Sequence, residues 1–167
     1  MADQVELFKG DSSATKHYGI DGNLTLQTLL DNDGVVEPDD GEKVYLYFGM
    51  RRGGDSYYAL DITDPDSPKF LWKSDGTKLP GIGQSWSTPM PTRINIEGVP
   101  QNDDRLVLVL GGGYDPSQDN DATSTDASGN AIYIVDSVSG ELLWHASKAG
   151  ANRNLDKMDY SIPADVR

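Results

Sequence analysis

Cysteine is absent from the 167 residues of this chain, which excludes disulfide bonds, thiolate metal sites and cysteine nucleophiles. Basic residues are scarce, since 14 Lys+Arg stand against 27 Asp+Glu and the formal net charge is -13. Such a negative field repels nucleic acids and anionic lipids and attracts cations, so no nucleic-acid partner is expected. Long apolar runs are missing as well. Runs such as Leu106–Leu110 are far shorter than the roughly 20 residues of a membrane span, and no membrane insertion is expected.

Turn-forming residues are plentiful. The chain holds 18 Gly and 9 Pro, and Asp and Asn cluster between short apolar runs. Many short strands joined by turns are typical of this pattern, so the sequence predicts an all-β fold. The segment 23–30 is the one helix-like candidate, but its Thr residues and its initial alternation favour a strand.

An internal repeat with an offset of about 75 residues accounts for most of the apolar sequence. Three pairs of segments align: 58–61 with 133–136, 70–72 with 142–144, and 86–89 with 160–163. The alignment matches Tyr58 with Tyr133 and Trp72 with Trp144. We therefore expect the two residues of each pair to occupy equivalent strands of adjacent sheets.

Each repeat reads as four short antiparallel strands, which is typical of a β-propeller blade. The predicted strands are roughly 18–28, 44–49, 56–62 and 69–73 in the first repeat (17–73), and 86–96, 105–111, 131–136 and 141–145 in the second (86–145), with the start of a further repeat at 158–167. About two blades and the start of a third cannot close a ring of about four to eight. We expect a partial β-propeller domain over 1–167, as a fragment of a longer chain. Self-assembly of copies, and a two-sheet sandwich with a coincidental repeat, are the alternatives.

The sequence of the turn in the second repeat predicts its hydrogen bonds and its backbone conformation. Asp136 is expected to accept backbone N–H bonds, and Gly140 to adopt a positive φ. Trp144 is expected to pack against an adjacent sheet, as Trp72 would one repeat earlier. The segment Ile134–Trp144 resembles the A-x-D-x-x-T-G-x-x-x-W motif of quinoprotein-like propellers.

Longer stretches carry a more specific pattern: His17–Gly22, Phe48–Gly54, Tyr57–Thr63, Gln84–Pro89, Gly111–Asp115 and Ser161–Arg167. In this order they resemble the carboxy-terminal propeller of the PilC/PilY family of bacterial type IV pilus proteins. The resemblance implies a secreted protein that passes through the periplasm to the cell surface or pilus tip. It also implies a role in pilus assembly, retraction control and adhesion, with minor pilins or a host or surface receptor as partners.

An enzymatic alternative is a fragment of a quinoprotein (PQQ-dependent) dehydrogenase, because the same motif occurs in that class. Such a site lies on the axis of a closed ring, and the adjacent cysteine pair of many such enzymes is missing here. His17 and His145 fall in different repeats, with no G-x-S-x-G segment near either. We therefore expect a non-enzymatic protein without catalytic residues. His145 should point away from the packing face of Trp144, into solvent or a blade edge.

Arg51 and Arg52 are adjacent arginines at a glycine-flanked turn of this acidic chain. They could form ion pairs with nearby Asp side chains and hold the turn, or anchor a carboxylate of a partner protein. The order Arg52-Gly53-Gly54-Asp55 contains no Arg-Gly-Asp triplet.

Two acidic loops concentrate the hard oxygen ligands that Ca²⁺ prefers. The first places Asp31, Asp33, Glu37 and Asp40 at the third, fifth, ninth and twelfth positions of an EF-hand-like pattern, with Gly34 at the sixth. Leu29 fails the first position, so this match is partial. The second loop offers Asp115, Asp119, Asp121 and Asp126 in an irregular arrangement. Both loops are candidate calcium sites, with solvated acidic turns as the alternative.

Overall fold

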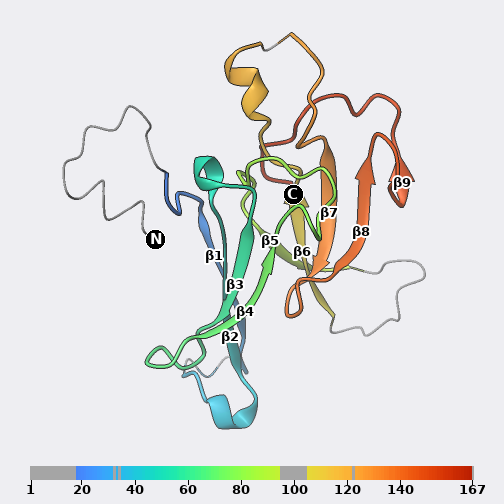
Figure 1. Ribbon diagram of the computed structural model, residues 1–167. Coiled ribbons are helices and arrows are strands. Elements are labelled where there is room, and N and C mark those ends of the chain that lie inside the picture. Colours follow the sequence, from blue (N-terminus) through green and yellow to red (C-terminus); the bar gives the residue numbers. More distant parts are fainter. Residues whose placement is uncertain (1–17, 32, 34, 95–104, 122, 167) are drawn as a thin grey trace, which may run out of the picture.

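The described residues form two sheets that face each other, and all their strands except the last pair antiparallel (Figure 1). The computed structural model describes residues 18–31, 33, 35–94, 105–121 and 123–166. In sequence order the first sheet contains β1 (Leu24–Leu29), β2 (Lys43–Gly49), β3 (Tyr57–Asp61) and β4 (Lys69–Ser74). These four strands match the strands predicted for the first repeat. His17, Gly34 and Arg167, which entered the sequence predictions, lie outside the described residues.

The second sheet contains the four strands predicted for the second repeat and one more. It runs β5 (Met90–Arg93), β6 (Leu106–Gly111), β7 (Ala131–Asp136), β8 (Leu142–Ser147) and β9 (Arg153–Asn154). The short β9 pairs in parallel with β8 at the outer edge of the sheet (Figure 1). Its two exposed polar residues carry no apolar alternation, so periodicity could not reveal it.

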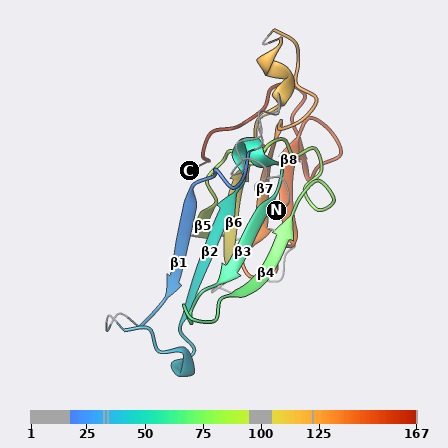
Figure 2. The same ribbon diagram turned by 60° about the vertical axis from the view of Figure 1, so that its left-hand side comes forward.

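The described part of the chain has three single turns of 3-10 helix in its loops: η1 (Pro38–Asp40), η2 (Arg51–Gly53) and η3 (Pro116–Asp119). Figures 1 and 2 place η1 at one end of the molecule, and η2 and η3 at the opposite end. The two predicted calcium loops therefore lie far apart. Among the described residues, no helix has the length and apolar character needed to cross a membrane.

The two sheets repeat each other in detail. Trp72 pairs with Ala59 across β3 and β4, and Trp144 pairs with Ile134 across β7 and β8. The register shifts immediately after Ala59 in the first sheet and immediately after Ile134 in the second. A register shift at the same step of both sheets is a shared structural feature, because such irregularities keep fixed positions in related sheets. The expected equivalence of the two tryptophans is confirmed.

The core lies between the sheets. The row Tyr47, Ala59 and Trp72 is 0–3% exposed and packs on the facing sheet, which contributes Leu108, Leu110, Tyr133 and Val135. The indole N–H of Trp72 donates to the carbonyl of Ser137 at 3.0 Å, across the interface. The predicted packing of Trp72 against the adjacent sheet is confirmed, and the structure adds a hydrogen-bond partner for its buried N–H.

The sheets are stacked head to tail. Trp72 faces the second sheet, but the equivalent row of the second sheet, Val109, Ile134 and Trp144, lies on the face turned away from the first. Conversely, Tyr133 faces the first sheet, whereas its equivalent Tyr58 lies on the first sheet's outer face. On that face Leu26 and Phe70 are 59% and 63% exposed. Each outer face is thus equivalent to the inner face of the other sheet.

Candidate interaction site

The turn after β2 is clamped to the segment that precedes β5. The backbone N–H groups of Met50 and Arg51 donate to the hydroxyl (2.8 Å) and the carbonyl (3.1 Å) of Ser85. The same hydroxyl donates to the carbonyl of Ser56 at 2.9 Å, and Ser85 is 1% exposed. A buried serine that satisfies several backbone groups fixes the turn relative to Trp86, the next residue.

Arg51 adopts a backbone conformation that its side chain disfavours. Its φ is 49°, and it is the one non-glycine residue with positive φ among the described residues. A left-handed conformation at a residue with a Cβ costs about 1–2 kcal/mol. Strain of this kind persists where surrounding contacts impose it and is concentrated at functional sites.

Two arginines and two aromatic rings form a cluster here, which we call the arginine–aromatic cluster: Arg51, Arg52, Trp86, Tyr114 and Asp119. The guanidinium carbons of Arg51 and Arg52 lie 4.5 and 5.6 Å from the centre of the Trp86 ring. Arg52 also lies 5.8 Å from the centre of Tyr114, whose ring is 5.1 Å from that of Trp86. These distances are within the range of cation–π attraction.

Asp119 joins the cluster from η3. It accepts two hydrogen bonds from the Arg52 guanidinium, at 2.8 and 3.2 Å, and a third from the Tyr114 hydroxyl at 2.6 Å. The hydrogen bonds from Arg52 and then Tyr114 lower the pKa of Asp119 to about 2, and Asp119 raises the pKa of Arg52. The predicted ion pair of this turn therefore forms at Arg52, with an Asp distant in sequence. Arg51 has no ion pair among the described residues.

The first acidic loop uses its carboxylates to shape its own backbone. Asp31 accepts from the N–H of Asp33 at 3.0 Å, and Asp33 accepts from the N–H of Val35 at 2.8 Å. Glu42, which the sequence reasoning missed, is 7% exposed and accepts from the N–H groups of Asp31 and Glu37. The loop is thus organised around Glu42, while Asp31, Asp33, Glu37 and Asp40 remain exposed.

The second acidic loop divides into buried and exposed carboxylates. Asp115 is 4% exposed and accepts from the N–H groups of Ser117, Ala127 and Ser128 at 2.7–3.0 Å. Burial raises its pKa, but these hydrogen bonds outweigh burial and lower the pKa to about 2. Asp115 therefore joins the start of this loop to its end through backbone hydrogen bonds.

The other candidate ligands of this loop have separate partners. Asp126 is 7% exposed and accepts from Gln118 and from the N–H of Ser161, while Asp121 is exposed and accepts from Thr123. Asp119 is held by Arg52. In the part of the chain that the structure describes, no three Asp, Glu or His side chains are grouped as a metal site would require. Calcium binding by either loop stays a prediction.

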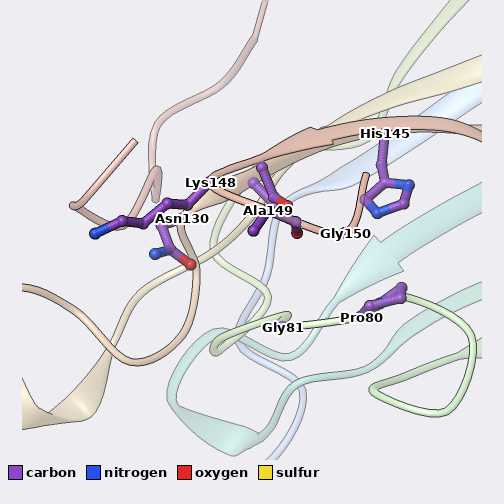
Figure 3. A pocket seen from close by; sticks show the side chains of 9 residues that line it. Pro80, Gly81, Asn130, His145, Lys148, Ala149 and Gly150 are labelled. Atoms are coloured by element: carbon purple, nitrogen blue, oxygen red, sulfur yellow. Dashed lines mark hydrogen bonds between the residues drawn. The ribbon is translucent and has the colours of Figure 1, made fainter. Parts of the chain in front are cut away.

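His145 borders a cavity of about 320 Å³ beside the sheet interface (Figure 3). It lies on the opposite face from Trp144, as predicted, but it is buried rather than solvent-facing, at 9% exposure. Its ring lies 6.2 Å from that of Tyr133, and its Nδ1 is 3.2 Å from the side-chain oxygen of Asn152. Lys148 also lines the cavity, but Figure 3 shows its side chain directed away from His145. The lining residues include no carboxylate.

Comparison with known proteins finds similarity to type IV pilus biogenesis factors. The chain is 28% identical over 110 residues to the type IV pilus biogenesis factor PilY1 homolog of Xylella fastidiosa, which covers 66% of this chain and 8% of that protein. It is 32% identical over 77 residues to PilY1 of Pseudomonas aeruginosa strain PAO1, covering 46% of this chain and 6% of that protein. These matches confirm the predicted resemblance to the PilC/PilY family. No family model matches it.

The solved PilY1 structure supports the same fold. The crystal structure of the P. aeruginosa PilY1 C-terminal domain matches with a TM-score of 0.54 and 24% identity, covering 80% of this chain and 22% of that one. The two-sheet arrangement is therefore shared with part of the PilY1 C-terminal domain. Because the chain spans less than a tenth of the PilY1 proteins it matches in sequence, their activities do not transfer to it directly. None of these relatives favours the quinoprotein alternative.

Proposed function

We propose that this chain is a non-enzymatic β-propeller segment that acts in type IV pilus biogenesis by binding pilus components, or a surface receptor, outside the cytoplasm. The similarity to type IV pilus biogenesis factors supports the pilus context. The arginine–aromatic cluster is the observation that supports binding. Arg, Trp and Tyr are the residues that most often dominate binding energy in protein interfaces, and here they are gathered on one partly exposed surface.

The propeller part of the proposal rests on the head-to-tail stacking. Two sheets related by a two-fold axis would bring equivalent faces together, but these sheets bring opposite faces together. Repeating a head-to-tail step adds further sheets without changing the interface, and the assembly becomes a ring if the rotation closes. The apolar outer faces would then be covered by further sheets of the same kind, which removes exposed edges and faces.

Capture of pilus proteins tests the binding function. A full-length protein that contains this chain is expected to retain minor pilins in a pull-down, and replacement of residues 18–166 by a flexible linker should abolish retention. Linker replacement of another segment of equal length is the control. Equal capture by the protein with and without residues 18–166 would contradict binding of pilus components by this segment. Failure of the full-length protein to capture any pilus component would remove pilus components as the partner and leave the surface receptor.

Calcium binding by the acidic loops is the second part of this proposal, with Asp31, Asp33, Glu37 and Asp40 in the first loop and Asp115, Asp119, Asp121 and Asp126 in the second. A cation would relieve repulsion among carboxylates in a chain of net charge -13. At 100 times its dissociation constant, calcium stabilises the folded state by about 2.7 kcal/mol. For a chain of this size we expect the melting temperature to rise by about 5–10 °C in millimolar calcium relative to chelator.

Paired substitutions locate the calcium effect. Asp31→Ala/Asp33→Ala and Asp119→Ala/Asp121→Ala should each reduce the shift that comes from the affected loop. Asp64→Ala/Asp66→Ala is the matched control, because the N–H of Asp66 donates to Asp64 at 3.0 Å in the same local geometry as Asp33 to Asp31. The calcium proposal fails if the parent chain shows no shift, or if neither loop variant changes it.

A further inference from the structure

The arginine–aromatic cluster contains two guanidinium groups but a single carboxylate. Arg52 is neutralised by the two hydrogen bonds from its guanidinium to Asp119. Arg51 lies over the same indole, at 4.5 Å, and its guanidinium has neither a carboxylate nor a hydrogen-bond acceptor among the described residues. One uncompensated positive charge is therefore fixed on a partly exposed surface of an otherwise strongly acidic chain.

We propose that Arg51, held against Trp86, binds a carboxylate of a partner polypeptide, either an Asp or Glu side chain or a free C-terminus. The inference deepens the proposed binding function and rests on it. A guanidinium stacked by one face keeps its N–H edge available, and this edge fits the two oxygens of a carboxylate. The contact between Arg52 and Asp119 is an internal example of the same recognition, beside the same ring.

The rest of the chain disfavours ligands of high negative charge. A net charge of -13 repels nucleic acids and sulfated glycans at long range, and a single free guanidinium cannot offset that repulsion. A lone carboxylate on a folded or extended polypeptide avoids most of this cost. The aromatic rings of Trp86 and Tyr114 add apolar surface beside the charge, which favours a peptide over a free anion.

The strain at Arg51 allows binding to be separated from folding. Because φ is 49° at this position, asparagine or glycine would adopt the backbone conformation more easily than arginine. The backbone N–H that donates to Ser85 is kept by either replacement. If Arg51 served only to hold the turn, its replacement would lower stability. If it serves binding, Arg51→Asn should retain or raise stability while binding is lost.

The test is an NMR titration of the intact chain, followed at the indole N–H of Trp86. The probe is a short peptide with two glutamates and a free C-terminus, compared with its glutamine, C-terminally amidated counterpart. We expect Arg51→Asn to weaken binding of the acidic peptide at least about tenfold, with an unchanged or higher melting temperature. Arg51→Lys should restore binding in part. Arg153→Gln, which removes an exposed arginine on β9, is the matched control and should have no effect.

The inference would be overturned by equal binding of the acidic and neutral peptides, by undiminished binding by Arg51→Asn, or by a melting temperature lowered by Arg51→Asn. Tighter binding of inorganic sulfate or of a heparin fragment than of the peptide would also contradict it. If a full-length Arg51→Asn protein captures minor pilins as well as the parent, the proposed function stands and this site does not carry it. If the peptide binds but no pilus component is captured, the carboxylate site stands and the pilus-binding function fails.

Discussion

Replacing Gly140 with alanine is expected to lower the free energy of unfolding by about 3–5 kcal/mol, measured by urea denaturation. Gly140 has a φ of 69°, and a Cβ at this position would lie 2.5 Å from Cδ2 of Trp72. The backbone strain accounts for about 1–2 kcal/mol. Displacement of a tryptophan that is 3% exposed accounts for the rest, because it disturbs tight packing and the hydrogen bond to Ser137.

A matched control separates backbone strain from the steric clash. Gly150 has nearly the same φ, 72°, but a Cβ there would meet nothing within 4 Å. Gly150→Ala should therefore show the strain alone, about 1–2 kcal/mol. In a Trp72→Ala background, the loss of unfolding free energy caused by Gly140→Ala should fall to about the same 1–2 kcal/mol, because the clash with the indole has been removed. Equal effects of Gly140→Ala and Gly150→Ala would mean that Trp72 and Gly140 are not packed as described.

Much of this interface could be predicted from the repeat. Asp136 accepts from the N–H groups of Val138 and Ser139, and Gly140 has the positive φ expected of the turn. Trp72 packs on the adjacent sheet, as predicted. These features are local or repeat with the sequence, so the pattern of apolar and turn residues is sufficient to find them.

The arginine–aromatic cluster could be predicted only in part. Arg51 and Arg52 stand out in an acidic chain, but their ring partners and Asp119 come from two other loops. Which loops meet depends on how the sheets stack, and no residue spacing encodes it. For the acidic loops, the sequence could not separate calcium ligands from residues that shape the loop, because both have the same local pattern. An Asp that closes its own turn, as Asp115 does, has the same local sequence as an Asp that binds a metal.

The two tryptophans provide the second large prediction, which concerns the stacking of further sheets. Trp72→Ala should lower the free energy of unfolding of this chain by about 3–5 kcal/mol, because it leaves a large cavity in the buried interface. Trp144 is equivalent in sequence and register, but it lies partly exposed on the outer face of the second sheet. Trp144→Ala should therefore cost less in this chain, about 1–2 kcal/mol, because the indole lies outside the core between the two sheets and is more exposed than that of Trp72.

The cost of Trp144→Ala should depend on chain length if another sheet stacks on this face. In a longer protein that continues past these residues, the indole would be buried as Trp72 is, and the cost should rise to about 3–5 kcal/mol. Trp72→Ala is the internal control, because its interface is complete in both chains and its cost should not change. Urea denaturation of the four variants gives the comparison. If the cost of Trp144→Ala stays small in the longer protein, the outer face of the second sheet is not an interface between sheets. The head-to-tail stacking would then stop at these two sheets.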